Sequence, residues 1–165
     1  MKECLKNLYF DMDEVLADFS KPDGKGDPIK RFRKEKDFFY NLKPKSVNIQ
    51  AVKMCIYKGY NVYILSKSPN KRCNEDKRRW LKKYLNEVPD GNIIFVPLKK
   101  SKVDYARANK HLKPTEKLQG SLFDDYHLNC YEWTTADGIE GSGFTVNPKG
   151  DGSLWTILVN ELKLI

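Results

Sequence analysis

The chain has 165 residues, of which 40% are hydrophobic and 32% charged, and its formal net charge is +8 at pH 7. This composition excludes a disordered chain, and the length fits one domain with a core of its own. No apolar run is long enough to cross a bilayer, and Met1–Lys6 lacks an apolar signal region. We therefore expect one domain over residues 1–165, a cytoplasmic location and no membrane partner.

The cysteines and the charge restrict the partners further. Cys4, Cys55, Cys73 and Cys130 are widely spaced, and no two of them form a Cys-x-x-Cys pair. This spacing argues against a zinc site and against a disulfide framework. The positive charge favours an anionic partner, which includes nucleic acid, an acidic membrane or a phosphorylated small molecule, without choosing among them.

Strand-like and helix-like segments alternate along the chain. Strands are indicated by short runs rich in Val, Ile, Tyr and Phe, and helices by apolar residues at helical spacing. In chain order we expect a strand at 8–10, a helix at 29–39, a helix from a Ser46 cap to Gly59, a strand at 60–65, a helix at 71–86, a strand at 92–96, a helix at 103–109, a strand at 120–123, a helix at 128–134, a fifth strand within 138–146 and a helix at 154–162. This alternation predicts a three-layer, Rossmann-like α/β fold whose central parallel sheet is covered by helices on both faces.

Polar side chains follow the expected strands where these end. In an open parallel sheet the carboxyl ends of the strands form the ligand-binding edge, so we expect these side chains to converge there. They are Asp11 and Asp13 after the first strand, Ser66 after the second, Lys99, Lys100 and Lys102 after the third, and Asp124 and Asp125 after the fourth.

This set of side chains favours phosphate chemistry with a metal ion. Crowded carboxylates repel one another unless a cation offsets their charge. Oxygen ligands at an open site favour Mg²⁺, which also accepts oxygens of a substrate phosphate. A lysine and a serine at the same edge would bind that phosphate, and a remaining carboxylate would serve as a nucleophile.

The motifs that carry these residues resemble those of the haloacid dehalogenase superfamily of phosphatases. The string from Asp11 to Phe19, Asp-Met-Asp-Glu-Val-Leu-Ala-Asp-Phe, is similar to the 5'(3')-deoxyribonucleotidase branch in particular. The resemblance runs from about residue 5 to about residue 160. The later motifs are Tyr63-Ile64-Leu65-Ser66, Phe95-Val96-Pro97 with Ser101-Lys102, and Phe123-Asp124-Asp125-Tyr126 with Asn129, Trp133 and Trp155.

The resemblance implies an aspartyl-phosphate mechanism on a nucleotide substrate. Asp11 would be the nucleophile, and Asp13 would protonate the leaving alkoxide and then activate water. Mg²⁺ would be bound by Asp11, by the backbone carbonyl of Asp13, and by Asp124 and Asp125, although which of these last two ligates directly stays open. The reaction would release phosphate from small-molecule (deoxy)ribonucleoside monophosphates.

The resemblance also implies which residues bind the phosphate. Ser66 would hold one phosphate oxygen, and Lys102 would pair with the phosphate and with the nucleophile. Lys102 is preferred because it begins a helix after Ser101, as in the resembling family. Lys99 and Lys100 remain alternatives, because they lie within the same short segment.

An insertion at about 20–45 lies where this superfamily places a small cap over the active site. Its aromatic side chains, with Phe19, Phe38 and Phe39 foremost, would either stack on a nucleobase or form the core of the cap itself. The sequence favours neither interpretation for the group as a whole.

Three other functions stay open. The same fold would serve a phosphatase of another small phosphate ester, because the shared motifs do not set specificity. The basic segment 71–83 would allow action on polynucleotide ends, although such a run is more often a solvated helix face. A non-catalytic nucleic-acid-binding module would explain the charge of +8, but it gives no reason for aspartates at the strand ends.

Overall fold

The computed structural model describes residues 7–20 and 25–163. Its main sheet has 6 strands in the order β5-β4-β1-β6-β7, with β8 also paired to β6. The pairings within this sheet are parallel, which confirms the expected α/β fold. The strands are β1 (Asn7–Phe10), β4 (Asn61–Ser68), β5 (Ile93–Pro97), β6 (Leu118–Asp124), β7 (Ile139–Glu140) and β8 (Gly143–Thr145).

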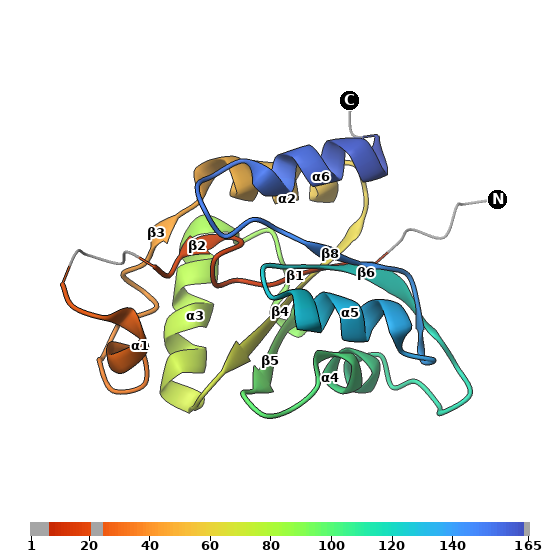
Figure 1. The fold of residues 1–165 in the computed structure, drawn as a ribbon, viewed down its shortest axis with the longest axis horizontal. Helices are drawn as coiled ribbons and strands as arrows, with labels where there is room; N and C mark the ends of the chain where they lie inside the picture. The colour runs from red at the N-terminus through yellow and green to blue at the C-terminus, as the bar shows by residue number, and fades with distance from the viewer. Residues whose placement is uncertain (1–6, 21–24, 164–165) are drawn as a thin grey trace.

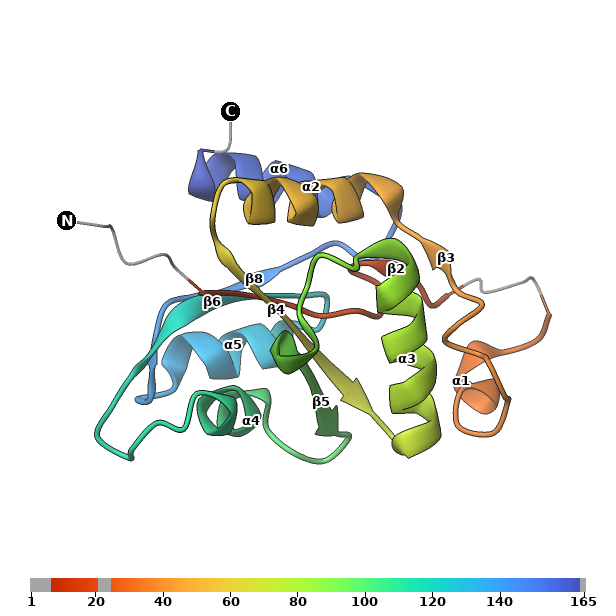
Figure 2. The ribbon, with the colours of Figure 1, turned by 180° about the vertical axis from the view of Figure 1, so that it is seen from behind.

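Helices cover both faces of this sheet (Figures 1 and 2). Side chains of one strand alternate between the faces, so Leu8 and Phe10 join one core while Tyr9 joins the other, beside Trp133. The first core is closed by α2 (Ser46–Tyr57), α3 (Lys71–Tyr84) and α6 (Ser153–Leu162), and the second by α4 (Lys102–Asn109) and α5 (His127–Thr135). Within the described residues, no helix combines the length and the apolar character needed to span a membrane.

Two helices are capped at their N-terminus by the residue directly before them, and a third is capped by a residue far away in the sequence. Asn70 caps α3 by accepting from the Cys73 amide at 2.9 Å, and Ser101 caps α4. The prediction that Ser46 caps α2 is wrong, because Ser46 is already the first helical residue. The carboxylate of Asp151 instead accepts from the amides of Val47 and Asn48, each at 3.0 Å.

The insertion after β1 is framed by a small antiparallel pair, β2 (Ala17–Asp18) and β3 (Lys43–Pro44). The helix expected at 29–39 is wrong in extent, since α1 spans only Pro28–Arg31 and turns follow it. Asp37 has a positive φ of 60°, which a continuing α-helix does not allow. The part of the insertion at 21–24 lies outside the described residues.

The fifth strand expected within 138–146 is divided into β7 and β8, which pair with different parts of β6. Gly141 lies between them with φ of 155°, and a Cβ at this position would come within 1.8 Å of the Gly120 carbonyl oxygen. The chain therefore passes so close to β6 that only glycine fits here.

Candidate active site

The strand register brings the predicted site residues to one edge of the sheet. Phe10 is level with Ile64 on β4 and with Phe123 on β6. Asp11, directly after β1, and Asp124, the last residue of β6, therefore lie at the same height on neighbouring strands. The Asp11 amide donates to the Phe123 carbonyl at 2.9 Å.

Lys102 is the lysine that reaches these aspartates. Its Nζ lies 3.0 Å from Oδ1 of Asp11 and 2.6 Å from Oδ2 of Asp124, and the side chain is buried. Burial opposes the charge, but the two carboxylates outweigh it and raise the pKa of Lys102. Lys99 and Lys100, the alternatives from the sequence, are exposed on the turn before α4.

A third carboxylate adjoins this pair. Asp11, Asp124 and Asp125 each offer an oxygen, and these oxygens lie within 4.8 Å of one another. Burial, with Asp124, Asp13 and Asp125 nearby, raises the pKa of Asp11 although Lys102 opposes this. Carboxylates that share one lysine carry surplus negative charge, and their hard oxygen donors suit Mg²⁺. The donor set therefore fits the expected metal ion.

Two hydrogen bonds orient the Asp124 carboxylate within this group. Its Oδ1 accepts from the backbone amide of Tyr126 at 2.9 Å, and its Oδ2 accepts from Nδ2 of Asn129 at 3.0 Å. Asp124 is fully buried, whereas Asp125 is only partly buried.

The pKa of Asp125 makes a testable difference to stability. Burial and the neighbouring Asp124 raise this pKa from 3.8 to about 6. The folded protein thus binds the proton of the Asp125 carboxyl more tightly than the unfolded chain does. Protonation of Asp125 therefore stabilises the folded state at a pH below the unfolded pKa, and this contribution to stability is lost as the pH rises through about 6. In EDTA we expect Asp125→Asn to be more stable than the wild type near neutral pH, with the gap closing towards pH ~4.

Urea unfolding of both proteins across this pH range measures the gap. Mg²⁺ should shrink or reverse the gap at neutral pH, because the ion favours the ionised carboxylate. If the difference in stability between the two proteins did not change with pH, the ionised Asp125 carboxylate would not be the destabilising group.

The second aspartate, Asp13, is paired with a lysine that our sequence reasoning missed. Nζ of Lys77 donates to Oδ2 of Asp13 at 2.8 Å, to Oγ of Ser66 at 2.9 Å and to the Lys67 carbonyl at 2.8 Å. It also lies 4.4 Å from the centroid of the Phe39 ring. Lys77 therefore joins two predicted site residues, while the other oxygen of Asp13 is buried without a partner among the described residues.

The prediction that segment 71–83 is a solvated basic face is thus wrong for Lys77, whose side chain is fully buried. Lys77 lies four residues after Cys73 and three before Trp80, and both of these are core residues of α3. The helical period therefore places the lysine on the buried face. A lysine at an apolar position of the helix was the signal in the sequence that would have identified it.

The aromatic side chains of the insertion pack on one another. Phe38 and Phe39 are only 2% and 1% exposed, and Phe19 contacts both with ring centroids 5.6 and 6.1 Å apart. Phe32 closes the same cluster. This arrangement fits a core of the insertion rather than ring faces open to a nucleobase.

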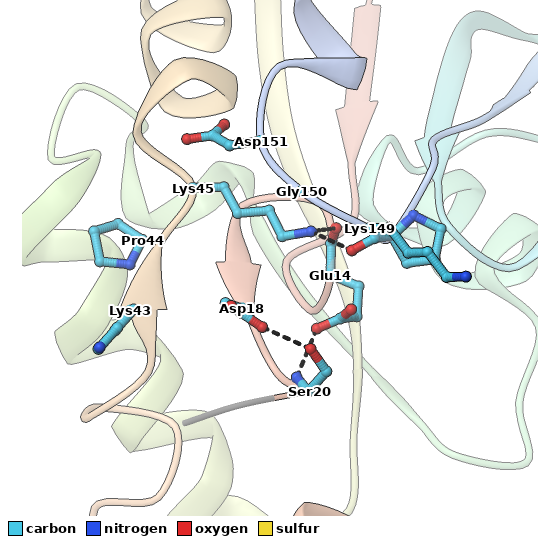
Figure 3. A pocket seen from close by; sticks show the side chains of 10 residues that line it. Glu14, Asp18, Ser20, Lys43, Pro44, Lys45, Lys149, Gly150 and Asp151 are labelled. Carbon is cyan, nitrogen blue, oxygen red and sulfur yellow. Dashed lines mark hydrogen bonds between the residues drawn. The ribbon is translucent and has the colours of Figure 1, made fainter. Parts of the chain in front are cut away.

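The turn at Glu14, directly after Asp13, is held by the partly buried Glu14 carboxylate and the buried Lys45 ammonium (Figure 3). Glu14 has a φ of 65°, and its carboxylate accepts from the amides of Phe19 and Ser20 at 2.5 and 2.8 Å. Nζ of Lys45 donates to the carbonyls of Glu14 and Pro148, at 2.8 and 2.6 Å. The same segments line a cavity of about 830 Å³ beside this turn.

Lys45→Met is expected to lower the free energy of unfolding by about 1–3 kcal/mol, because both carbonyls would lose their buried donor. Lys43→Met, two residues away on the exposed side of β3, is the matched control and should change stability little. Urea unfolding of both variants checks this expectation. Equal effects at the two positions would show that the Lys45 hydrogen bonds contribute nothing specific.

Comparisons with known proteins place the fold. No protein-family model matches the chain, and a search of curated proteins finds no match. Among solved structures, the chain is similar to one chain in a structure of a Pnkp1/Rnl/Hen1 complex, with a TM-score of 0.61 and 18% sequence identity. The match covers 91% of this chain and 48% of the other chain, so this chain spans about half the length of the chain that it matches. At this identity the similarity shows a shared fold.

Proposed function

We propose that the protein is a Mg²⁺-dependent phosphatase of the haloacid dehalogenase type, which hydrolyses nucleoside monophosphates through an aspartyl-phosphate on Asp11. The observation that carries this proposal is the buried centre in which Lys102 bridges Asp11 and Asp124 beside Asp125. A carboxylate nucleophile, a fixed ammonium and an oxygen-rich metal site are the groups that phosphoryl transfer to a carboxylate requires.

The metal site would consist of the three clustered carboxylates of Asp11, Asp124 and Asp125, together with the Asp13 carbonyl implied by the resembling motif. A bound Mg²⁺ would reduce the repulsion between nucleophile and phosphate, and it would stabilise the charge that develops on the transferred group. Lys102, which is already held between two of these carboxylates, supplies a further positive charge at the same place.

The reaction then divides between the two aspartates of the first motif. The Asp11 carboxylate attacks phosphorus, the ester P–O bond breaks, and Asp13 gives a proton to the leaving oxygen. Asp13 next takes a proton from a water molecule that attacks the aspartyl-phosphate, which releases phosphate and restores Asp11. Lys77 would position Asp13 and Ser66 for this reaction, because its one ammonium group donates to both side chains.

The nucleotide part of the proposal depends on the string Asp11–Phe19 and on the insertion that follows it. The string resembles the deoxyribonucleotidase branch, and the insertion lies where the superfamily places a small cap. The surplus of positive charge suits a phosphorylated substrate. The shared fold with the Pnkp1/Rnl/Hen1 structure agrees with a phosphatase of this type but does not distinguish the substrate.

Phosphate release from a panel of esters tests the proposal. The panel contains 5'- and 3'-deoxyribonucleoside monophosphates, their ribonucleotide counterparts and p-nitrophenyl phosphate, each with Mg²⁺ and with EDTA. We expect Mg²⁺-dependent turnover with preference for nucleotides. Turnover of the aryl ester alone would retain the chemistry and reject the nucleotide substrate, whereas an inert panel would reject the proposal.

A further inference from the structure

The cations of helix α3 are largely occupied by contacts within the protein. Lys77 lies in the candidate site, and the Arg72 guanidinium donates to two carbonyls of the insertion at 3.0 and 2.6 Å. Arg79 pairs with Asp37 at 2.7 Å and lies over the Tyr40 ring. The side chains of Arg72, Lys77 and Arg79 are therefore not free to bind an external anion.

Four lysines lie around the carboxyl ends of β4 and β5: one within β4, one at the first residue of α3 and two on the turn after β5. Ser68 is level with Pro97 in the parallel pair, so the two strand ends lie side by side at the carboxyl edge of the sheet. Lys71, Lys99 and Lys100 are exposed, and Lys67 is partly buried. In the part of the chain that the structure describes, none of these four lysines, hereafter the lysine rim, forms an ion pair.

The lysine rim is continuous with the candidate phosphate site. The backbone carbonyl of Lys67 accepts from Nζ of Lys77 at 2.8 Å. Lys102, two residues after Lys100, reaches Asp11 at 3.0 Å. The rim lysines are thus neighbours in the chain of residues that contact Lys77 or belong to the candidate phosphate site.

The other side of the site carries charges of both signs. Asp125 follows β6, on the other side of β1 from β4 and β5. Glu14 and Asp18, in the segment after β1, line one cavity together with Lys43 and Lys149. A polyanion whose end is bound at Asp11 would be attracted over the carboxyl ends of β4 and β5, where the rim lysines form no ion pair with the described residues.

We propose that the phosphate removed at Asp11 is the terminal phosphate of a single-stranded polynucleotide, and that the lysine rim binds the backbone phosphates next to it. This inference rests on the proposed phosphatase chemistry at Asp11 and replaces the mononucleotide by a polynucleotide end as the preferred substrate. Lys102, Lys77 and Ser66 would bind the one phosphate at Asp11. A mononucleotide has no further phosphate that could contact the lysine rim. Further backbone phosphates supply that partner, and their binding depends strongly on salt.

The test compares short oligothymidylates phosphorylated at the 5' or the 3' end with the matching thymidine monophosphates. If four lysines contact phosphates, kcat/KM for the oligonucleotide, relative to the mononucleotide, should fall about 50-fold between about 50 and about 200 mM salt. The double variant Lys99→Gln/Lys100→Gln should reduce this fall to about 7-fold, because half of the contacts are lost.

A matched double variant controls for charge alone. Lys58 and Lys113 are exposed and precede β4 and β6, so they lie towards the amino edge of the sheet. Lys58→Gln/Lys113→Gln removes the same charge and should retain the salt dependence of the wild type. Equal loss in the two double variants would overturn the assignment of the rim, as would equal turnover of oligonucleotide and mononucleotide at low salt.

A binding measurement separates this inference from the proposed function. Fluorescence anisotropy with a labelled, phosphorylated oligothymidylate needs no turnover, and it can use both wild type and Asp11→Asn. Salt-sensitive binding that weakens in Lys99→Gln/Lys100→Gln supports the rim even if no ester is hydrolysed, in which case the phosphatase proposal alone fails. Absence of binding, with mononucleotide hydrolysis intact, rejects the rim and leaves the phosphatase proposal standing.

Discussion

Asp11→Asn is expected to lower phosphate release by at least about a thousandfold, because an amide cannot form the aspartyl-phosphate. The loss should appear in kcat for every ester in the panel, since each would pass through the same covalent intermediate. A matched control is Asp90→Asn, which makes the same chemical change on a side chain that is 90% exposed. Residual turnover within tenfold of the wild type would reject Asp11 as nucleophile.

The same substitution should not destabilise the protein in EDTA. Burial raises the pKa of Asp11, and the neighbouring Asp124 and Asp125 raise it further. Asparagine removes a charge from this crowded group, while Lys102 keeps Asp124 as its partner at 2.6 Å. We therefore expect the midpoint of thermal unfolding to stay equal or rise, as is common when function has placed like charges together. A large fall in this midpoint would mean that lost activity reflects lost folding.

Lys77→Met is expected to lower kcat/KM by about 10²–10³-fold, the effect typical of removing one preorganised donor from an active site. The ammonium of Lys77 donates to Asp13, Ser66 and the Lys67 carbonyl, so its loss frees two side chains and one carbonyl at once. Methionine fills a similar volume and keeps the contact with the Phe39 ring. Steady-state kinetics on the best nucleotide of the panel measures the effect.

Two comparisons distinguish a role in the site from a role in folding. Lys82→Met on the exposed side of the same helix should leave kinetics and stability close to those of the wild type. Lys77→Met should lower the free energy of unfolding by about 1–3 kcal/mol, because buried acceptors are left without a donor. If the folded variant retains wild-type kcat and KM, the ammonium has no part in the reaction.

The site residues that could be predicted from the sequence are those that lie at the ends of the expected strands. A buried strand that stops at Asp11, and another that stops at Asp124, place these carboxylates at one edge of a parallel sheet. The choice of Lys102 had a local cue as well, since Ser101 caps the helix that Lys102 begins. Its reach to both carboxylates depends on the packing of α4 against the sheet, which no local pattern shows.

Other features depend on contacts between segments far apart in the chain. Asp151 caps α2 across 104 positions, so the neighbouring Ser46 misled the prediction. Lys77 reaches Asp13 across 64 positions, and its charge concealed its place on the buried face of α3. Helix α1 in the insertion likewise ends earlier than predicted. The aromatic residues that follow it pack on one another in a small core and do not continue the apolar side of a helix.

The sequence by itself determined the α/β fold and the edge of the sheet where the aspartates meet, because strand periodicity and strand ends are local properties that do not depend on partners. Only the tertiary structure decided which lysines serve the carboxylates and which stay free on the lysine rim. The physical reason is that a buried ammonium needs several acceptors at hydrogen-bond distance. Those acceptors, from β1, β4 and β6, come together only when the sheet and its helices have packed.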